Sequence, residues 1–410
     1  MQLVGQLLMQ FNSDALRQLF SQSKVALIYG AAGTGKSTMV NYIANYFNDK
    51  SKLFLAHTNP AKDNLQRKVT AQSSTFKTIN SQIYSKSNPE YDLVVIDECS
   101  TVSNADLLKV LEKTTFKLLV LVGDVYQIES IQFGNWFSLV RSFIPSTAIF
   151  ELTKPHRTKD EMLLTFWSKV RNIEEDIAEF IAQNGYSTVL DRSLFEAKGK
   201  DEIILCLNYD GLYGINNINR FLQGNNPSPA IIWRDTVYKI DDPILFNDTG
   251  RFDGVIYNNL KGQIINVHKF EERIQFDIQL DRPISELDVL GTELEWMGES
   301  TVRFSVFDSE NSDDDDDEIN SLVPFQVAYA VSIHKAQGLE YDSVKIVITD
   351  SNEDQISHNI FYTAVTRARK SLKIFWTPET QQKVLQQLKR DVSSKDVNII
   401  SIRRNLTKVI

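Results

Sequence analysis

The chain of 410 residues is poor in cysteine and has no long apolar run. Its two cysteines, Cys99 and Cys206, are too few for a disulfide framework, which favours a reducing compartment and predicts a cytoplasmic protein. Apolar runs such as those at 93–96 and 118–122 are far too short to span a bilayer. The first residues are interrupted by glutamines and carry no basic group, so they do not predict a signal peptide. With 42% hydrophobic and 24% charged residues, the composition is that of a globular protein.

The sequence also lacks an excess of basic residues. Lysine and arginine number 44 against 53 aspartates and glutamates, and the net charge of −9 by itself argues against a polyanionic partner. Eight of these acids lie at 308–318, however, and the rest of the chain carries only −1. A local basic groove is therefore still compatible with the composition. The acidic run predicts a solvated, poorly ordered loop; alternatively, it shields a nucleic-acid groove or binds a basic partner.

Short apolar runs alternate with amphipathic segments over most of the chain, whose length allows two or three domains. This alternation predicts parallel sheets and therefore an α/β fold. Residues 233–307 differ, because recurring turn signals and two strands that look antiparallel, 263–269 and 274–279, predict a small β-barrel inserted into the second α/β domain. The run at 147–152 fits the end of the first domain or the start of the second. Strands are expected elsewhere at 24–29, 53–57, 92–97, 117–123, 147–152, 202–208, 326–333, 343–349 and 371–376, and helices at 36–47, 104–111, 133–142 and 379–389.

Residues 30–37, with the sequence GAAGTGKS, match the phosphate-binding loop pattern G-x-x-x-x-G-K-[ST] between a predicted strand and a predicted helix. Glycines let the backbone N–H groups face phosphate oxygens, and the helix N-terminus adds positive potential. Lys36 would neutralise phosphate charge, and the Ser37 hydroxyl suits Mg²⁺, which prefers hard oxygen ligands. The predicted nucleotide-binding residues here are Gly30, Gly33, Thr34, Gly35, Lys36, Ser37 and Thr38.

Two carboxylates, Asp97 and Glu98, end the apolar strand at 92–97. An ATPase needs one acid near Mg²⁺ and another to orient or deprotonate water, and Asp97 suits the first role and Glu98 the second. Read alone, they could equally be ordinary surface acids that cap a strand. Gln127 follows the next strand, where a neutral amide can sense the γ-phosphate without adding charge; without further context it would be a loop residue.

The order of these motifs resembles that of superfamily 1 helicases, most closely the RecD-like and Dda-like branch. Six segments are similar to that family's motifs I to VI in sequence order, namely 30–38, 95–100, 123–130, 151–158, 329–344 and 362–372. The resemblance implies two RecA-like parallel-sheet lobes with an SH3-like β-barrel inserted in the second. We therefore expect a first lobe at 1–146, a second lobe formed by 147–232 and 325–410, and the insert with its acidic loop at 233–324.

The resemblance also implies ATP and Mg²⁺ as ligands and adds residues to the nucleotide site. Arg157 and Arg367 would face the γ-phosphate and stabilise charge on the transferring group, whereas either would otherwise be read as a solvated arginine. Glu340, which follows Gly338 by two residues, would accept a hydrogen bond from the ribose. The two lobes would then close on ATP.

Single-stranded nucleic acid is the partner that the resemblance implies. His334 has a competing interpretation, a packed core histidine, and Asn80 stands where the family usually has histidine. The predicted contacts are Thr58, Asn59, Lys62, Thr78, Asn80, Asn208, Ser332, His334 and Lys335.

The sequence departs from the family between 65 and 92, which is too short for an obvious strand-separating hairpin. Gln18 and Gln22 are candidates for reading adenine, although they fit a short amphipathic helix equally well. The function predicted is an ATP-dependent helicase or translocase moving 5′ to 3′ on DNA. The alternative is a nucleic-acid-stimulated ATPase switch or translocase that does not unwind duplex, or a motor whose wedge comes from a partner protein. A small-molecule kinase shares only the phosphate-binding loop.

Overall fold

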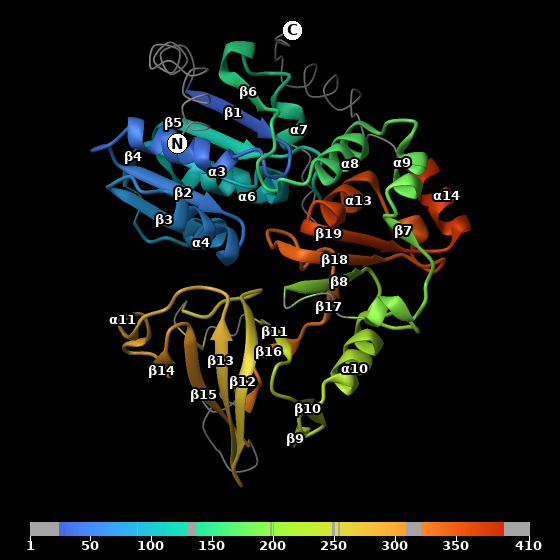
Figure 1. The fold of residues 1–410 in the computed structure, drawn as a ribbon. Coiled ribbons are helices and arrows are strands. Elements are labelled where there is room, and N and C mark those ends of the chain that lie inside the picture. The colour runs from blue at the N-terminus through green and yellow to red at the C-terminus, as the bar shows by residue number, and fades with distance from the viewer. Residues whose placement is uncertain are drawn as a thin grey trace. The chain divides into compact units, whose positions relative to one another are not determined.

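A computed structural model describes residues 24–87, 89–128, 136–196, 199, 201–247, 251–252, 255–308 and 321–388 (Figure 1). These residues form two compact units. The first contains 24–177, 357–366 and 387–388, and the second contains 178–356 and 367–386. Within the described ranges, no helix has the length and apolarity needed to cross a membrane.

The first unit is built on a sheet of six parallel strands in the order β3-β2-β4-β5-β1-β6. The central strands are almost completely buried, which is why they appear in the sequence as continuous apolar runs. The strands are β1 (Val25–Gly30), β2 (Lys52–Ala56), β3 (Ser74–Thr78), β4 (Glu90–Ile96), β5 (Thr115–Gly123) and β6 (Ile149–Leu152). Helical elements of this unit are α3 (Lys36–Tyr46), α4 (Asn59–Lys68), α5 (Ile79–Ile83), η1 (Cys99–Thr101), α6 (Asn104–Lys113), α7 (Trp136–Val140), η2 (Ser146–Ala148), α8 (Glu161–Asn172) and α13 (His358–Val365).

Two features of this sheet differ from the sequence analysis. Strand β3 was not expected, because its sequence STFKT has no apolar run; it lies at an edge of the sheet and is only partly buried. Strand β6 pairs with β1, so the run at 147–152 belongs to the first sheet. A lobe boundary before residue 147 would cut this sheet, and the first unit instead runs on to Ile177.

The second unit contains a sheet of five parallel strands in the order β17-β8-β18-β19-β7. Together the two parallel sheets confirm the predicted α/β class. The strands are β7 (Ser187–Thr188), β8 (Glu202–Cys206), β17 (Ala330–Ser332), β18 (Tyr341–Val347) and β19 (Ala368–Phe375). The helical elements are α9 (Ile177–Gln183), η3 (Arg192–Phe195), α10 (Ile215–Asn225), α11 (Glu286–Val289), η5 (Glu353–Gln355) and α14 (Pro378–Gln387).

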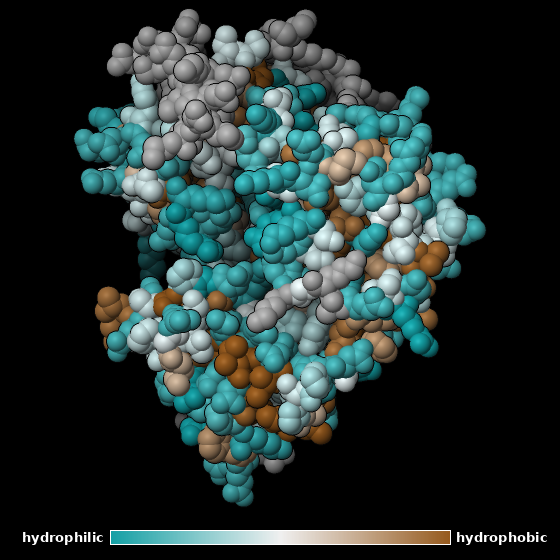
Figure 2. Space-filling model, in the orientation of Figure 1, coloured by the Kyte–Doolittle hydropathy of each residue, from teal (hydrophilic) through white to brown (hydrophobic). Residues whose placement is uncertain are grey.

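An antiparallel sheet is inserted into this unit, in the order β14-β15-β13-β12-β11-β16. Its antiparallel character was predicted correctly, whereas its SH3-like form stays a prediction. The strands are β11 (Pro243–Phe246), β12 (Lys261–Lys269), β13 (Arg273–Leu280), β14 (Glu295–Gly298), β15 (Thr301–Phe307) and β16 (Phe325–Val327), preceded by a hairpin of β9 (Ile231–Trp233) and β10 (Thr236–Tyr238). On the face shown in Figure 2, hydrophobic surface residues lie over the insert and also over the rest of the second unit.

The connection back from the insert corrects one predicted strand. Residues 326–333 form two strands: β16 pairs with β11 of the insert, and β17 pairs with β8 of the parallel sheet. A boundary before residue 325 would therefore remove an edge strand from the insert. The buried Asp242 links the segment that enters the insert with the segment that leaves it. Its carboxylate accepts hydrogen bonds from Gln223, Asn226 and Tyr329 at 2.6–2.9 Å.

Candidate nucleotide site and nucleic-acid residues

The predicted nucleotide residues of the first unit all follow carboxyl ends of its parallel strands. The phosphate-binding loop follows β1, Asp97 and Glu98 follow β4, Gln127 follows β5, and Arg157 follows β6. These strands are neighbours in the order β4-β5-β1-β6. Because the carboxyl ends of parallel strands meet at one edge of a sheet, the structure brings these segments together, where open α/β sheets bind their ligands.

Glycines of the phosphate-binding loop stand where a side chain would not fit. A Cβ added to Gly30 would lie 2.3 Å from Thr34 Oγ1, and one added to Gly33 would lie 2.3 Å from the Cβ of Arg157. Gly33 also accepts a hydrogen bond from the backbone N–H of His156 at 2.6 Å. Gly35 has a φ of +85° and begins α3 in the left-handed region. The loop is thus a narrow backbone cradle of the kind that encloses phosphate groups.

The ammonium group of Lys36 lies inside this cradle. Its Nζ donates to the carbonyl oxygens of Gly30 at 2.8 Å and Ala31 at 3.0 Å. Burial lowers the pKa of Lys36, while the nearby carboxylates of Asp124 and Asp97 act in the opposite direction. The Lys36 side chain is therefore poorly solvated, and a phosphate anion would be a favourable partner for its charged form.

Asp97 and Glu98 differ in environment. Asp97 is 7% exposed and its Oδ1 accepts a hydrogen bond from the Glu98 N–H at 2.9 Å. Burial raises the pKa of the Asp97 carboxyl, opposed by that hydrogen bond and by Lys36. Glu98 is partly exposed and has a left-handed backbone, φ 53° and ψ 42°, and its carbonyl accepts hydrogen bonds from Thr101. Strained backbone of this kind is concentrated at functional sites.

A magnesium ion fits the donor set at this edge. Ser37 and Asp97 supply hard oxygen ligands, and Mg²⁺ in such sites takes its remaining ligands from water and substrate phosphates. Among the described residues no group of three or more histidine, cysteine, aspartate or glutamate side chains is arranged to hold a metal alone.

A second set of buried residues joins α13 to this site, and the sequence analysis missed its members. The Tyr362 hydroxyl accepts a hydrogen bond from the Ala32 N–H of the phosphate-binding loop at 3.2 Å and donates one to Asp124 Oδ2 at 3.2 Å. Tyr362 was noted only as part of the motif at 362–372, because nothing local connects it with a loop 330 residues earlier.

The predicted lobe boundaries put both phosphate-facing arginines in the second lobe, which is wrong for Arg157: it lies in the first unit, after β6, and only Arg367 lies in the second. Arg157 is packed against Gly33, as described above, and its Nη1 donates to the Thr366 carbonyl at 2.8 Å. Arg367, the next residue in the chain, opens the last segment of the second unit. It is 2% exposed, and its Nη1 donates to the Leu339 carbonyl at 3.1 Å. Their action on a phosphate stays a prediction.

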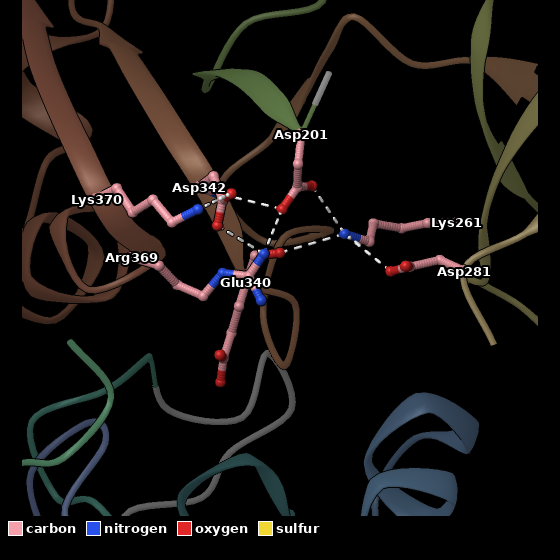
Figure 3. A network of polar contacts seen from close by, with 7 residues as sticks. All are labelled: Asp201, Lys261, Asp281, Glu340, Asp342, Arg369 and Lys370. Atoms are coloured by element: carbon pink, nitrogen blue, oxygen red, sulfur yellow. Dashed lines mark hydrogen bonds and ion pairs between the residues drawn. The ribbon is translucent and has the colours of Figure 1, made fainter. Parts of the chain in front are cut away.

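An ion network contacts the backbone of the segment that contains Gly338 and Glu340 (Figure 3). Lys261 of the insert donates to the Glu340 carbonyl at 3.3 Å and forms ion pairs with Asp201 and Asp281 at 3.1 and 3.0 Å. Figure 3 shows the Glu340 side chain pointing away from the network. The Glu340 backbone is therefore tied to the insert while its carboxylate is left outside the network, and Gly338 turns the chain with a φ of +80°. Further ion pairs join Arg369 to Asp201 and Asp342, and Lys370 to Asp342.

Comparison with known proteins shows which families this chain resembles. The description AAA domain matches residues 9–191, and UvrD-like helicase C-terminal domain matches 327–374. The RecD subunit of the RecBCD enzyme from Mycolicibacterium smegmatis is 22% identical, and the match covers 69% of this chain and 50% of the RecD subunit. The ATP-dependent DNA helicase Pif1 from Campylobacter jejuni is 23% identical, and the match covers 89% of this chain and 85% of that helicase. The chain is thus similar to RecD and Pif1 helicases of superfamily 1. This confirms the resemblance predicted from its motifs.

Solved structures show the same fold. The crystal structure of Pif1 helicase from Bacteroides in complex with ADP-AlF3 and ssDNA has a TM-score of 0.56 and 16% identity, covering 96% of this chain and 97% of its own. Pif1 helicase from Candida albicans also has a TM-score of 0.56, with 17% identity, covering 97% of this chain and 99% of its own. This chain spans only 24–50% of the length of the RecD proteins that it matches.

The predicted nucleic-acid residues of the first unit follow two paired strands. Ala56 of β2 is paired with Thr78 of β3, so the segments after them start at one edge of the sheet. Thr58 caps α4 by accepting from the Ala61 N–H at 3.3 Å, and Thr78 caps α5 by accepting from the Ser81 N–H at 3.1 Å. Asn59 is the first residue of α4, Lys62 forms a 3.6 Å ion pair with Asp63, and Asn80 is exposed.

The predicted nucleic-acid residues of the second unit lie at the ends of the paired strands β8 and β17. Ser332 pairs with Cys206, two residues before Asn208. The Ser332 hydroxyl accepts from the Lys335 N–H at 3.1 Å, and Lys335 Nζ donates to Gln326 Oε1 at 2.8 Å. His334 is exposed, so the alternative of a packed core histidine is wrong.

Some sequence predictions lie outside the described residues. These are the adenine-reading candidates Gln18 and Gln22, most of the acidic run at 308–318, and the residues beyond 388.

Proposed function

We propose that this chain is an ATP-driven motor that moves 5′ to 3′ along single-stranded DNA and unwinds duplex. The observation that supports it best is the meeting of the phosphate-binding loop, Asp97, Glu98 and Arg157 at one edge of a parallel sheet. The names of its relatives agree, since they include an ATP-dependent DNA helicase and a structural neighbour bound to ADP-AlF3 and ssDNA.

In this proposal the chain's own residues divide the work of ATP hydrolysis. Lys36 and the loop N–H groups bind the phosphates, and Ser37 and Asp97 hold Mg²⁺, which neutralises phosphate charge when bound. Glu98 orients the attacking water and accepts its proton. Gln127 senses the γ-phosphate, Arg157 and Arg367 stabilise its developing charge, and Glu340 binds the ribose. The binding set is Gly30, Gly33, Thr34, Gly35, Lys36, Ser37, Thr38, Gly338 and Glu340.

Single-stranded DNA would be held by the polar residues that follow β2, β3, β8 and β17 in the two units. Hydroxyl, amide and ammonium groups bind the sugar-phosphate backbone without reading bases, which suits a motor that must move through any sequence. The ten-residue helix α4 adds a helix N-terminus next to Thr58 and Asn59, where backbone N–H groups favour phosphate.

The first test is ATP hydrolysis with and without a single-stranded oligonucleotide. We expect a sharp rise in turnover with DNA, because the DNA-bound form aligns both arginines. Duplexes with a 5′ or a 3′ single-stranded tail, made in DNA and in RNA, then test polarity and substrate. Turnover that no nucleic acid changes would refute the motor, and unwinding from 3′ tails alone would refute the direction.

A second candidate is a translocase or ATPase switch that binds single strands without separating duplex. It is supported by the chain between 65 and 92, where the described residues form the end of α4, β3, α5 and the start of β4, and no β-hairpin. A forked duplex with one labelled strand distinguishes the candidates. ATP-dependent release of the strand supports the helicase, whereas DNA-stimulated hydrolysis without release supports the switch, or a wedge supplied by a partner protein.

A further inference from the structure

The hydroxyl group of Tyr362 makes two hydrogen bonds that join α13 to the phosphate-binding loop. It accepts from the Ala32 N–H at 3.2 Å and donates to Asp124 Oδ2 at 3.2 Å. Tyr362 is 1% exposed, Asp124 is 2% exposed and Ala32 is 1% exposed, so these groups are shielded from solvent. Burial and the neighbouring Asp124 raise the pKa of Tyr362 well above its ordinary value, so the hydroxyl stays protonated and can donate.

Helix α13 is held in the first unit by further hydrogen bonds to other segments of that unit. Thr363 Oγ1 accepts from the Ile128 N–H at 3.0 Å, and the Val365 carbonyl accepts from Trp167 Nε1 at 3.0 Å. The Thr366 carbonyl accepts from Arg157, and Arg367 follows directly in the chain. A movement of α13 would therefore shift the residue that precedes Arg367.

The Ala32 N–H has one hydrogen and cannot fully serve two acceptors. A loop of this kind binds nucleotide by pointing its N–H groups at phosphate oxygens. Hydrogen bonds to an anionic oxygen are roughly twice as strong as bonds between neutral groups. A phosphate oxygen that reaches the Ala32 N–H would therefore displace the Tyr362 hydroxyl, which would keep its bond to Asp124.

We propose that Tyr362 is a positioning residue that reports nucleotide binding to α13, because its hydroxyl occupies the Ala32 N–H until a phosphate oxygen replaces it. The exchange removes a hydrogen bond between the phosphate-binding loop and α13. Helix α13, and with it the segment that leads to Arg367, is then less tightly bound to the loop. The inference rests on the proposed function, since it requires that the loop bind a nucleoside triphosphate.

The test is Tyr362→Phe, which removes the hydroxyl and keeps the ring. In the variant, ATP binding no longer has to break the bond between Ala32 and Tyr362. A hydrogen bond of this kind contributes about 0.5–1.5 kcal/mol, so we expect the variant to bind a non-hydrolysable ATP analogue with Mg²⁺ about 2- to 10-fold more tightly. A purely structural role predicts unchanged or weaker binding, because a loosened α13 would disturb the loop.

Thr363→Val is the matched control. It removes a hydrogen bond of the same helix, to Ile128, and leaves the bond to Ala32 intact. Both variants should lower the thermal unfolding temperature, but only Tyr362→Phe should tighten nucleotide binding. Equal or weaker binding by Tyr362→Phe, or tightening by both variants, would overturn the proposal.

A second measurement uses the full chain with 3-fluorotyrosine at position 362, so the proposal stays testable if Tyr362→Phe fails to fold. The fluorine resonance should shift on adding the ATP analogue with Mg²⁺, because the hydroxyl loses the Ala32 donor. An unchanged resonance at saturating analogue would overturn the sensing role alone. If the wild-type chain bound no ATP, the proposed function and this inference would both be wrong.

Discussion

Gly33→Ala should damage the nucleotide site through two effects that the structure separates. Gly33 has a φ of +73°, and an L-residue in this region is strained by about 1–2 kcal/mol. In addition, the new methyl group would lie 2.3 Å from the Arg157 Cβ, whereas carbon atoms pack at about 3.5–4.0 Å. The two segments must separate by about 1 Å, which at a well-packed position costs a further ~1–3 kcal/mol. We expect a total loss of about 2–5 kcal/mol in the free energy of unfolding.

Two glycines provide controls for this prediction. Gly35 has a φ of +85°, but a Cβ there would find no atom closer than 3.9 Å, so Gly35→Ala should cost only the backbone strain of about 1–2 kcal/mol. Gly224 lies in α10 with no atom within 4 Å of its added Cβ, and Gly224→Ala should be neutral or stabilising by up to about 1 kcal/mol.

Urea unfolding followed by circular dichroism gives the stability of the three variants, and ATP hydrolysis at saturating DNA gives their activity. We expect Gly224→Ala to be the most stable variant, Gly35→Ala to be less stable and Gly33→Ala to be the least stable. Gly33→Ala should also have the lowest ATPase activity, because Arg157 is displaced. If Gly33→Ala and Gly35→Ala were equal in stability and activity, the close approach of Arg157 to the loop would be wrong.

Three other substitutions test separate parts of the site. Glu98→Gln should keep ATP binding and slow single-turnover hydrolysis by about 10²- to 10⁴-fold, since only proton acceptance is lost; unchanged turnover would exclude Glu98 as the base. Asp97→Asn should abolish hydrolysis yet raise the free energy of unfolding at neutral pH. Burial raises the pKa of Asp97 in the folded protein, so the wild type loses stability as pH rises from the unfolded pKa of about 3.9 to the raised folded pKa. Asparagine does not titrate, so the free energy of unfolding of the variant should lack this decrease with pH. Equal pH profiles of unfolding for the two proteins would contradict the prediction. Lys261→Met should destabilise the second unit by about 1–3 kcal/mol, because it removes an ammonium group of 19% side-chain exposure that pairs with Asp201 and donates to the Glu340 carbonyl. Lys370→Met, at 73% side-chain exposure, should cost under about 1 kcal/mol, and equal losses in thermal unfolding would refute the network.

Much of the first unit could be predicted because its signals are local. The buried strands were visible as apolar runs, and the phosphate-binding loop and the acids of β4 were visible as short motifs beside them. Strand β3 was missed for the same reason, since a half-buried edge strand with the sequence STFKT carries no apolar run. The run at 326–333 was read as one strand because periodicity does not show that β16 and β17 join different sheets.

The sequence by itself determined the chemistry of the site: which residues carry phosphate-binding N–H groups, charge and metal-binding oxygens, and that each follows a strand. Only the tertiary structure decided that Arg157 packs against Gly33, that Lys261 holds the Glu340 backbone, and that the Tyr362 hydroxyl bonds to Ala32. The physical reason is the range of the interactions. A motif reports the preferences of neighbouring residues, whereas these contacts join residues 79–330 positions apart, and their geometry depends on how whole elements pack.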